Sequence, residues 1–71
     1  MCLHWINHSG GHLARSPLGL YLTYQSFDLE SGALCWFGKF EIDGKLLGFG
    51  PFDTLKIAQQ SCENHAQKLE A

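Results

Sequence analysis

The residues best equipped for chemistry are a cysteine and three histidines near the start of the chain. They fall within eleven positions, with spacing C-x-H-x3-H-x3-H, and are Cys2, His4, His8 and His12. Cysteine and histidine are the usual ligands of Zn²⁺, but structural sites generally draw them from two short pairs separated by a loop. Gly10 and Gly11 disfavour a helix that would align the histidines, although a hairpin could bring His4 near His12. We expect exposed histidines with neither metal nor cofactor, and keep a zinc-binding interaction module as an alternative.

A second pair, Cys62 and His65, lies at i and i+3 in a segment with helical periodicity. A thiol beside an imidazole can act as a nucleophile when the imidazole removes its proton. Both residues belong to the apolar stripe of the expected helix, which favours packing over reaction. No G-x-S-x-G element is present. The sequence therefore predicts a protein that is not an enzyme.

Composition limits the partners that the chain can have. Its 71 residues make one domain, with five basic and seven acidic residues and a formal charge of −2. The basic residues are scattered, whereas duplex-binding modules usually show a basic surface. Nucleic-acid binding is therefore disfavoured, although the aromatic residues could stack bases in a small nucleic-acid-binding regulator. Three cysteines, no CxxC pair and no long apolar stretch favour a cytoplasmic protein that does not enter a membrane.

The pattern of turns and apolar residues predicts strands first and a helix last. Gly10-Gly11, Pro17 and Asp43-Gly44 mark turns, and apolar residues from Leu55 to Leu69 recur every three or four positions. The fold class is α+β, a meander of three to four antiparallel strands with one C-terminal helix on one face. The candidate strands are residues 3–7, 12–16, 20–27, 33–41 and 46–50, and the helix is 53–69.

Alternation along the strands assigns a covered and an uncovered face. We expect the core between helix and sheet to contain Leu22, Trp36, Phe49, Leu55, Ala58 and Cys62. The opposite register then lines the uncovered face with Tyr21, Thr23, Cys35, Phe37 and Lys39. Aromatic residues on an uncovered sheet face are typical anchors of protein interfaces. The sequence therefore predicts that this face binds another protein or a second copy of the chain.

The segments LARSPLGLYLTY, CWFGKF and LLGFGPFDTLKIAQQSCENHA resemble a class of small proteins encoded by phages and prophages. In that class an aromatic-rich meander ends in a step of the type lG-x-f-x-t-l-x-x-A-k into a single helix. The corresponding step here runs from Leu47 to Ala58, and the resemblance covers about residues 13–66. It implies an accessory protein that binds a host protein complex. Its most specific form is an anti-defence role such as inhibition of a CRISPR effector complex.

Overall fold

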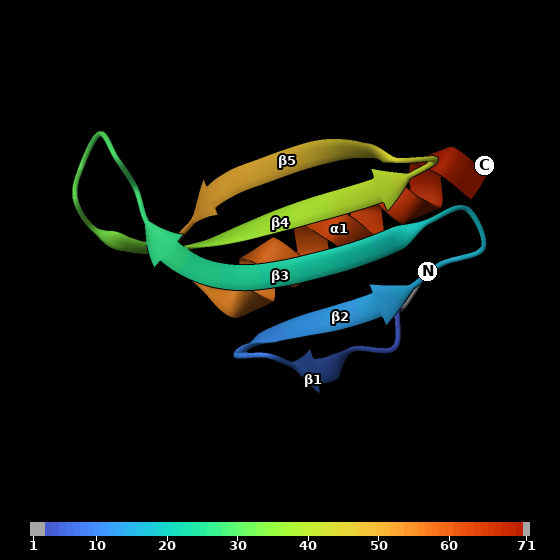
Figure 1. Cartoon of the computed structure of the whole chain (residues 1–71), viewed down its shortest axis with the longest axis horizontal. Coiled ribbons are helices and arrows are strands. Elements are labelled where there is room, and N and C mark those ends of the chain that lie inside the picture. Colours follow the sequence, from blue (N-terminus) through green and yellow to red (C-terminus); the bar gives the residue numbers. More distant parts are fainter. Residues whose placement is uncertain (1–2, 71) are drawn as a thin grey trace.

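The computed structural model describes residues 3–70, with only the backbone of Glu70, as a five-stranded sheet and one helix. Every strand pairs antiparallel with its neighbour in sequence, so the order across the sheet is the order along the chain (Figure 1). This architecture confirms the predicted α+β meander with a C-terminal helix, with five strands in place of three to four. The elements are β1 (Ile6–His8), β2 (Gly11–Arg15), β3 (Leu20–Phe27), β4 (Leu34–Ile42), β5 (Lys45–Phe52) and α1 (Leu55–Glu70).

Two of the hairpins turn through only two residues. Ser9 and Gly10 join β1 to β2 with φ values of 47° and 83°, and Asp43 and Gly44 join β4 to β5 with 50° and 77°. Positive φ at both positions defines the type I′ turn, whose twist matches that of the flanking strands. The Asp-Gly pair therefore adopts the turn that its sequence predicts. The sequence predicts that the last strand ends at residue 50, but Pro51 lies within β5, which resumes pairing at Phe52 after a register shift.

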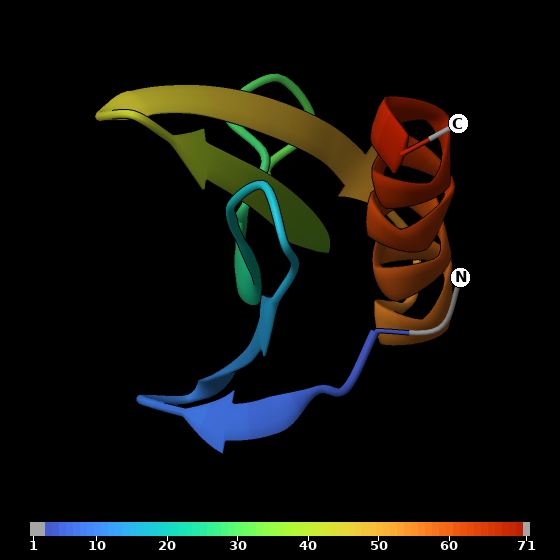
Figure 2. The same ribbon diagram turned by 90° about the vertical axis from the view of Figure 1, so that its right-hand side faces the viewer.

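Helix α1 lies on the concave side of the curved sheet (Figure 2). The Thr54 hydroxyl caps it by accepting a hydrogen bond from the Ile57 backbone N–H at 3.2 Å. Three small residues spaced four apart, Ala58, Cys62 and Ala66, are the fully buried stripe that faces the strands. Small side chains on this stripe let the helix approach the sheet closely.

The sheet has small residues where the helix comes closest. Thr23 pairs with Gly38 across β3 and β4, and both are buried. A Cβ atom added to Gly38 would lie 2.9 Å from the Cys62 sulfur, closer than real Cβ contacts permit. Glycine at this position is therefore a requirement of helix packing.

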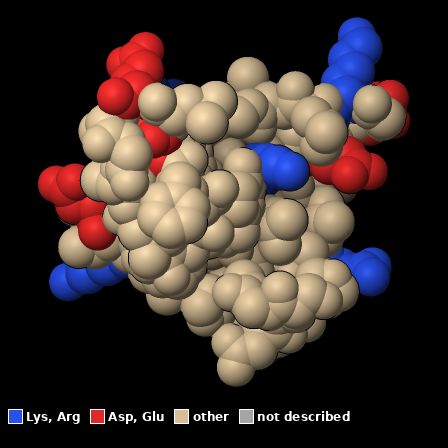
Figure 3. Space-filling view, turned by 60° about the vertical axis from the view of Figure 1, so that its left-hand side comes forward, with Lys and Arg blue, Asp and Glu red and all other residues tan. Residues whose placement is uncertain are grey.

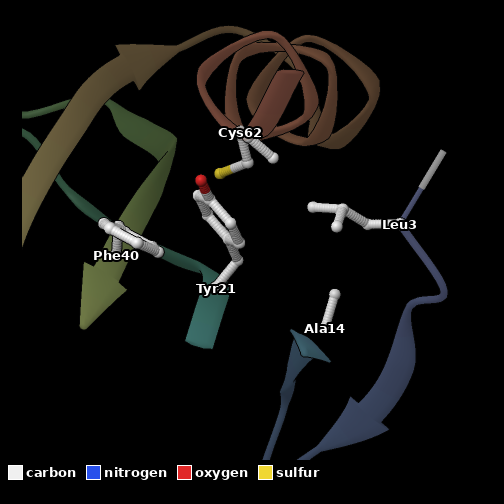
Figure 4. Packing of buried hydrophobic residues seen from close by; sticks show 6 residues of the cluster. Leu3, Ala14, Tyr21, Phe40 and Cys62 are labelled. Atoms are coloured by element: carbon white, nitrogen blue, oxygen red, sulfur yellow. The ribbon is translucent and has the colours of Figure 1, made fainter. Parts of the chain in front are cut away.

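Larger side chains fill the core on either side of this contact. Tyr21 stacks on Phe40 with ring centroids 4.5 Å apart, and both lie beneath the helix with Cys62 (Figure 4). Leu3 and Ala14 complete the buried cluster from the N-terminal side of the sheet. The core is thus built by all parts of the chain, including the segment before β1.

The expected core is partly right. Ala58 and Cys62 are fully buried, and Phe49 packs against the cluster while staying partly exposed. Trp36 and Leu55 are only half-buried. Leu22 is wrongly assigned, because it pairs with Lys39 on the face opposite α1. In the part of the chain that the structure describes, no helix has the length and apolarity needed to cross a bilayer.

Candidate protein-binding surface

The sheet face turned away from α1 carries a row of apolar side chains that crosses several strands. Leu13 pairs with Leu22, which pairs with Lys39, and Tyr24 pairs with Phe37 one step along the strands. Cross-strand partners point to the same face, and each of these five residues has the opposite register to the buried Ala14, Tyr21, Gly38 and Phe40. All five are half-buried. We call Leu13, Leu22, Tyr24, Phe37 and Lys39 the open-face patch.

The aromatic pair is the centre of the patch. The Tyr24 and Phe37 rings stack with centroids 5.8 Å apart, and the Lys39 ammonium lies 4.9 Å from the Tyr24 centroid. Aromatic stacking and cation–π contact each contribute about 0.5–1.5 kcal/mol, so the pair is held in place before any partner arrives. Gly50 approaches Phe37 so closely that an added Cβ would lie 3.1 Å from its ring. The backbone of β5 therefore supports the ring without a competing side chain.

Two residues predicted for this surface are on the wrong face. Tyr21 and Thr23 are fully buried, each with 0% exposure, on the side covered by α1. The Tyr21 hydroxyl is 2.7 Å from His65 Nδ1 on α1, and the Thr23 hydroxyl points to the His12 carbonyl oxygen at 3.5 Å. Both polar groups therefore face partners inside the protein.

The other three predicted residues, Cys35, Phe37 and Lys39, share the register of the open face. Cys35 pairs with Ser26 near the end of β3 and is half-buried. Phe37 and Lys39 are members of the open-face patch itself. The prediction therefore assigned β4 correctly and inverted β3.

Leu13, Leu22 and Tyr24 are the surface residues that sequence reasoning missed. Leu22 and Tyr24 looked like core residues because they alternate with the more polar Thr23. The informative signal was side-chain size rather than polarity. The buried helix stripe consists of the small residues Ala58, Cys62 and Ala66, which allow a close approach to the sheet. The sheet position nearest to the helix therefore also favours small residues, which are Gly38 and its partner Thr23.

The N-terminal histidines are not gathered into a site. His12 pairs with Asn7 and packs near Trp36, whose ring centroid is 6.3 Å away, whereas His8 pairs with Gly11. His8 and His12 have opposite registers and therefore point to opposite faces. Among residues 3–70, no three His, Cys, Asp or Glu side chains lie close enough to hold a metal ion. Cys2 lies outside the described residues.

Cys62 and His65 differ in their surroundings despite sharing a helix. Burial raises the pKa of the Cys62 thiol to about 12, and the nearby Glu63 carboxylate adds to the effect. A thiol with this pKa remains protonated at neutral pH and is a poor nucleophile. His65 forms its close contact with Tyr21 instead. This pair therefore acts in packing and hydrogen bonding.

A shallow hollow borders the aromatic pair at the loop between β3 and β4. Its lining includes Tyr24 and Phe37 together with Asp28 and Glu30. On the side of the molecule shown in Figure 3, uncharged residues form most of the surface and charged side chains lie mainly at the rim. The carboxylates of Asp28 and Glu30 beside the rings would repel the phosphate groups of a nucleic acid.

Comparisons with protein-family models, with curated protein sequences and with solved structures find no match for this chain.

Proposed function

We propose that this chain is a non-enzymatic protein-binding domain that binds its partner through the open-face patch. The observation that carries the proposal is the partly exposed Tyr24–Phe37 stack on a sheet face that α1 leaves uncovered. Aromatic residues in such positions contribute a large share of binding energy at protein interfaces. Because the stack and the Lys39 contact already fix the rings, little side-chain freedom is lost on binding.

Apolar burial should dominate this interaction. Leu13 and Leu22 extend the aromatic pair across β2 and β3, and the single ammonium of Lys39 lies over a ring. The chain carries a small net charge of −2, so long-range steering contributes little to the association rate. Association should therefore depend weakly on salt.

In its most specific form, the proposal is that of a phage or mobile-element accessory protein whose partner is a host protein complex. Support for this origin comes from the resemblance of the meander and its step into α1 to small phage and prophage proteins. An anti-defence role follows, with a CRISPR effector complex as the first candidate partner. The relevant assay measures target cleavage by the purified effector with and without this protein.

The binding surface is tested by replacing Tyr24 and Phe37 together with serine. The matched control is Leu34→Ser, which removes an exposed apolar side chain from β4 at a register opposite to the patch. We expect the double variant to stay folded and to lose the host proteins retained by the parent, while the control retains them. Equal retention by the double variant, with unchanged circular dichroism, would contradict the proposal.

Oligonucleotide binding distinguishes the nucleic-acid alternative. Phosphate contacts make affinity fall steeply with salt, whereas an apolar protein interface is much less sensitive. Single-stranded DNA and RNA are titrated at low and high salt against the parent and the double variant. Tight, salt-sensitive binding that depends on Tyr24 and Phe37 would assign the patch to base stacking instead.

A further inference from the structure

The outer edge of β5 is a second surface with binding capacity. β5 is the last strand in the sheet order, so the described residues provide no strand to pair with its outer side. It is eight residues long, whereas the opposite edge strand β1 has three. Leu46 and Leu47 on β5 are 64% and 47% exposed. A long apolar edge strand is a template for an additional strand.

Two hollows lie between α1 and the sheet on the β5 side of the molecule, and the second also reaches Phe40 and Ile42 on β4. The first has a volume of about 540 Å³ and is lined by Phe49 and by α1 residues such as Ile57. The second, of about 370 Å³, is almost entirely apolar and includes Leu47 and Leu69 in its lining. His65 lines both hollows, so the two are adjacent, and we refer to them together as the groove.

The charged residues of the groove are all basic. Lys56 and Lys68 line the first hollow, and Lys45 lines the second. No aspartate or glutamate is among the described residues that line either hollow. The groove thus holds three of the five basic residues of a chain whose net charge is −2. Its charge is opposite in sign to that of the whole molecule.

We propose that this groove binds an extended acidic segment of a partner protein, which pairs with β5 as a sixth strand. Backbone hydrogen bonds to the strand edge supply affinity, and alternate side chains of the segment enter the groove. Apolar side chains occupy the hollows, while carboxylates meet the three lysines. The site goes beyond the proposed function, because it uses the β5 edge and α1 rather than the open-face patch.

Charge also distinguishes this occupant from a second copy of the chain. A two-fold β5–β5 pairing would place the two α1 helices side by side and antiparallel. Lys56 of one copy would then approach Lys68 of the other, and like charges oppose that arrangement. An acidic strand can form the same backbone hydrogen bonds with β5 without this repulsion.

The test uses the full chain and a defined probe, a blocked peptide about as long as β5. One face of the peptide carries valine and glutamate in turn and the other face carries threonine, so that both kinds of side chain can enter the groove. Binding is followed by amide chemical shifts. We expect changes concentrated at Leu46–Gly50 and along α1 beside β5. The same peptide with lysine in place of glutamate, and one with N-methylated alternate amides, should each bind at least about tenfold more weakly.

Variants then test the role of the lysines. Lys56→Glu and Lys68→Glu, both at exposed helix positions, should each weaken binding about three- to tenfold, whereas the control Arg15→Glu on β2 should not. Four outcomes would overturn the proposal: no binding at about 1 mM peptide, equal binding of the N-methylated peptide, unchanged affinity in both lysine variants, or a β5-paired dimer in solution. Because Tyr24 and Phe37 are not involved, loss of the open-face function would leave these results unaffected.

Discussion

At Gly38 the absence of a side chain determines how closely α1 can pack. An added Cβ would lie 2.9 Å from the Cys62 sulfur and 3.3 Å from the Phe49 ring. Gly38→Ala should therefore destabilise the protein by about 1–3 kcal/mol, the usual effect of overpacking a core. Chemical denaturation of the variant measures this change.

Removal of the sulfur gives the matched control. In a Cys62→Ala background, Gly38→Ala loses its nearest clash, so its effect should shrink by about 0.5–2 kcal/mol. If the two substitutions were additive, the proposed contact between Gly38 and Cys62 would be wrong.

Cys62 should also make stability depend on alkaline pH. Its pKa is about 12 in the folded protein against a usual 9.0, so below pH 9 the thiol is protonated in both states. Above pH 9 the unfolded chain releases the proton while the folded protein keeps it, and the free energy of unfolding falls as pH rises toward 12. Denaturation curves for parent and Cys62→Ala should differ in this range. Parallel pH profiles would contradict the assignment.

Alkylation gives an independent reading of the same thiol. A pKa of about 12 lowers the thiolate fraction at neutral pH by about three orders of magnitude, so Cys62 should react far more slowly in the folded protein than after unfolding. Mass spectrometry of the alkylated peptides identifies the modified cysteine. Rapid labelling of Cys62 under native conditions would show that the helix opens.

Among the elements, α1 packs against the sheet and also forms hydrogen bonds with the segment before β1. One oxygen of the Glu63 carboxylate accepts hydrogen bonds from the Leu3 backbone N–H at 3.1 Å and from the Trp5 indole N–H at 3.3 Å. These contacts join residues about sixty positions apart, from opposite parts of the chain. Glu63 therefore fixes the first hairpin to the helix.

Glu63→Ala should cost about 1–3 kcal/mol, because two half-buried donors lose a charged acceptor. Amide hydrogen exchange should rise first in β1 and β2, and the fluorescence of Trp5 should shift to the red. Glu63→Gln keeps an acceptor oxygen and should show a smaller effect, and Glu30→Ala in the exposed β3–β4 loop should show none. Unchanged amide hydrogen exchange in β1 would show that Glu63 does not stabilise the position of the first hairpin.

The elements themselves could be predicted from sequence, but the alternation of polar and apolar residues does not give the register between β3 and β4. The predicted loop, residues 28–32, has five residues, whereas Phe27 pairs with Leu34 across a six-residue loop. Side chains alternate along a strand, so an error of one residue exchanges the two faces of β3. The observed register places Tyr21 and Thr23 in the core and Leu22 and Tyr24 on the open face, the reverse of the predicted assignment. Polarity in LYLTYQSF is too evenly divided to signal the difference.

On the scale of the whole molecule, a metal should contribute nothing to stability. The structure places His8 and His12 in opposite registers, so these two side chains cannot jointly bind one ion. We expect elemental analysis of the purified protein to show no stoichiometric zinc and EDTA to leave the melting temperature unchanged. Zinc bound at about one ion per chain, lost on replacing His8 and His12 together, would contradict this expectation.

The position of α1 after all five strands has a consequence for synthesis. During translation the strands leave the ribosome before the helix, so the sheet face bearing Tyr21 and Phe40 has no cover until residues 55–70 follow. Newly made chains are aggregation-prone while such apolar surface is exposed. A nascent chain stalled after β5 should be digested readily by protease and should bind a chaperone that recognises apolar segments. Extension of the same chain through α1 should confer protease resistance, because α1 is the element that covers this face.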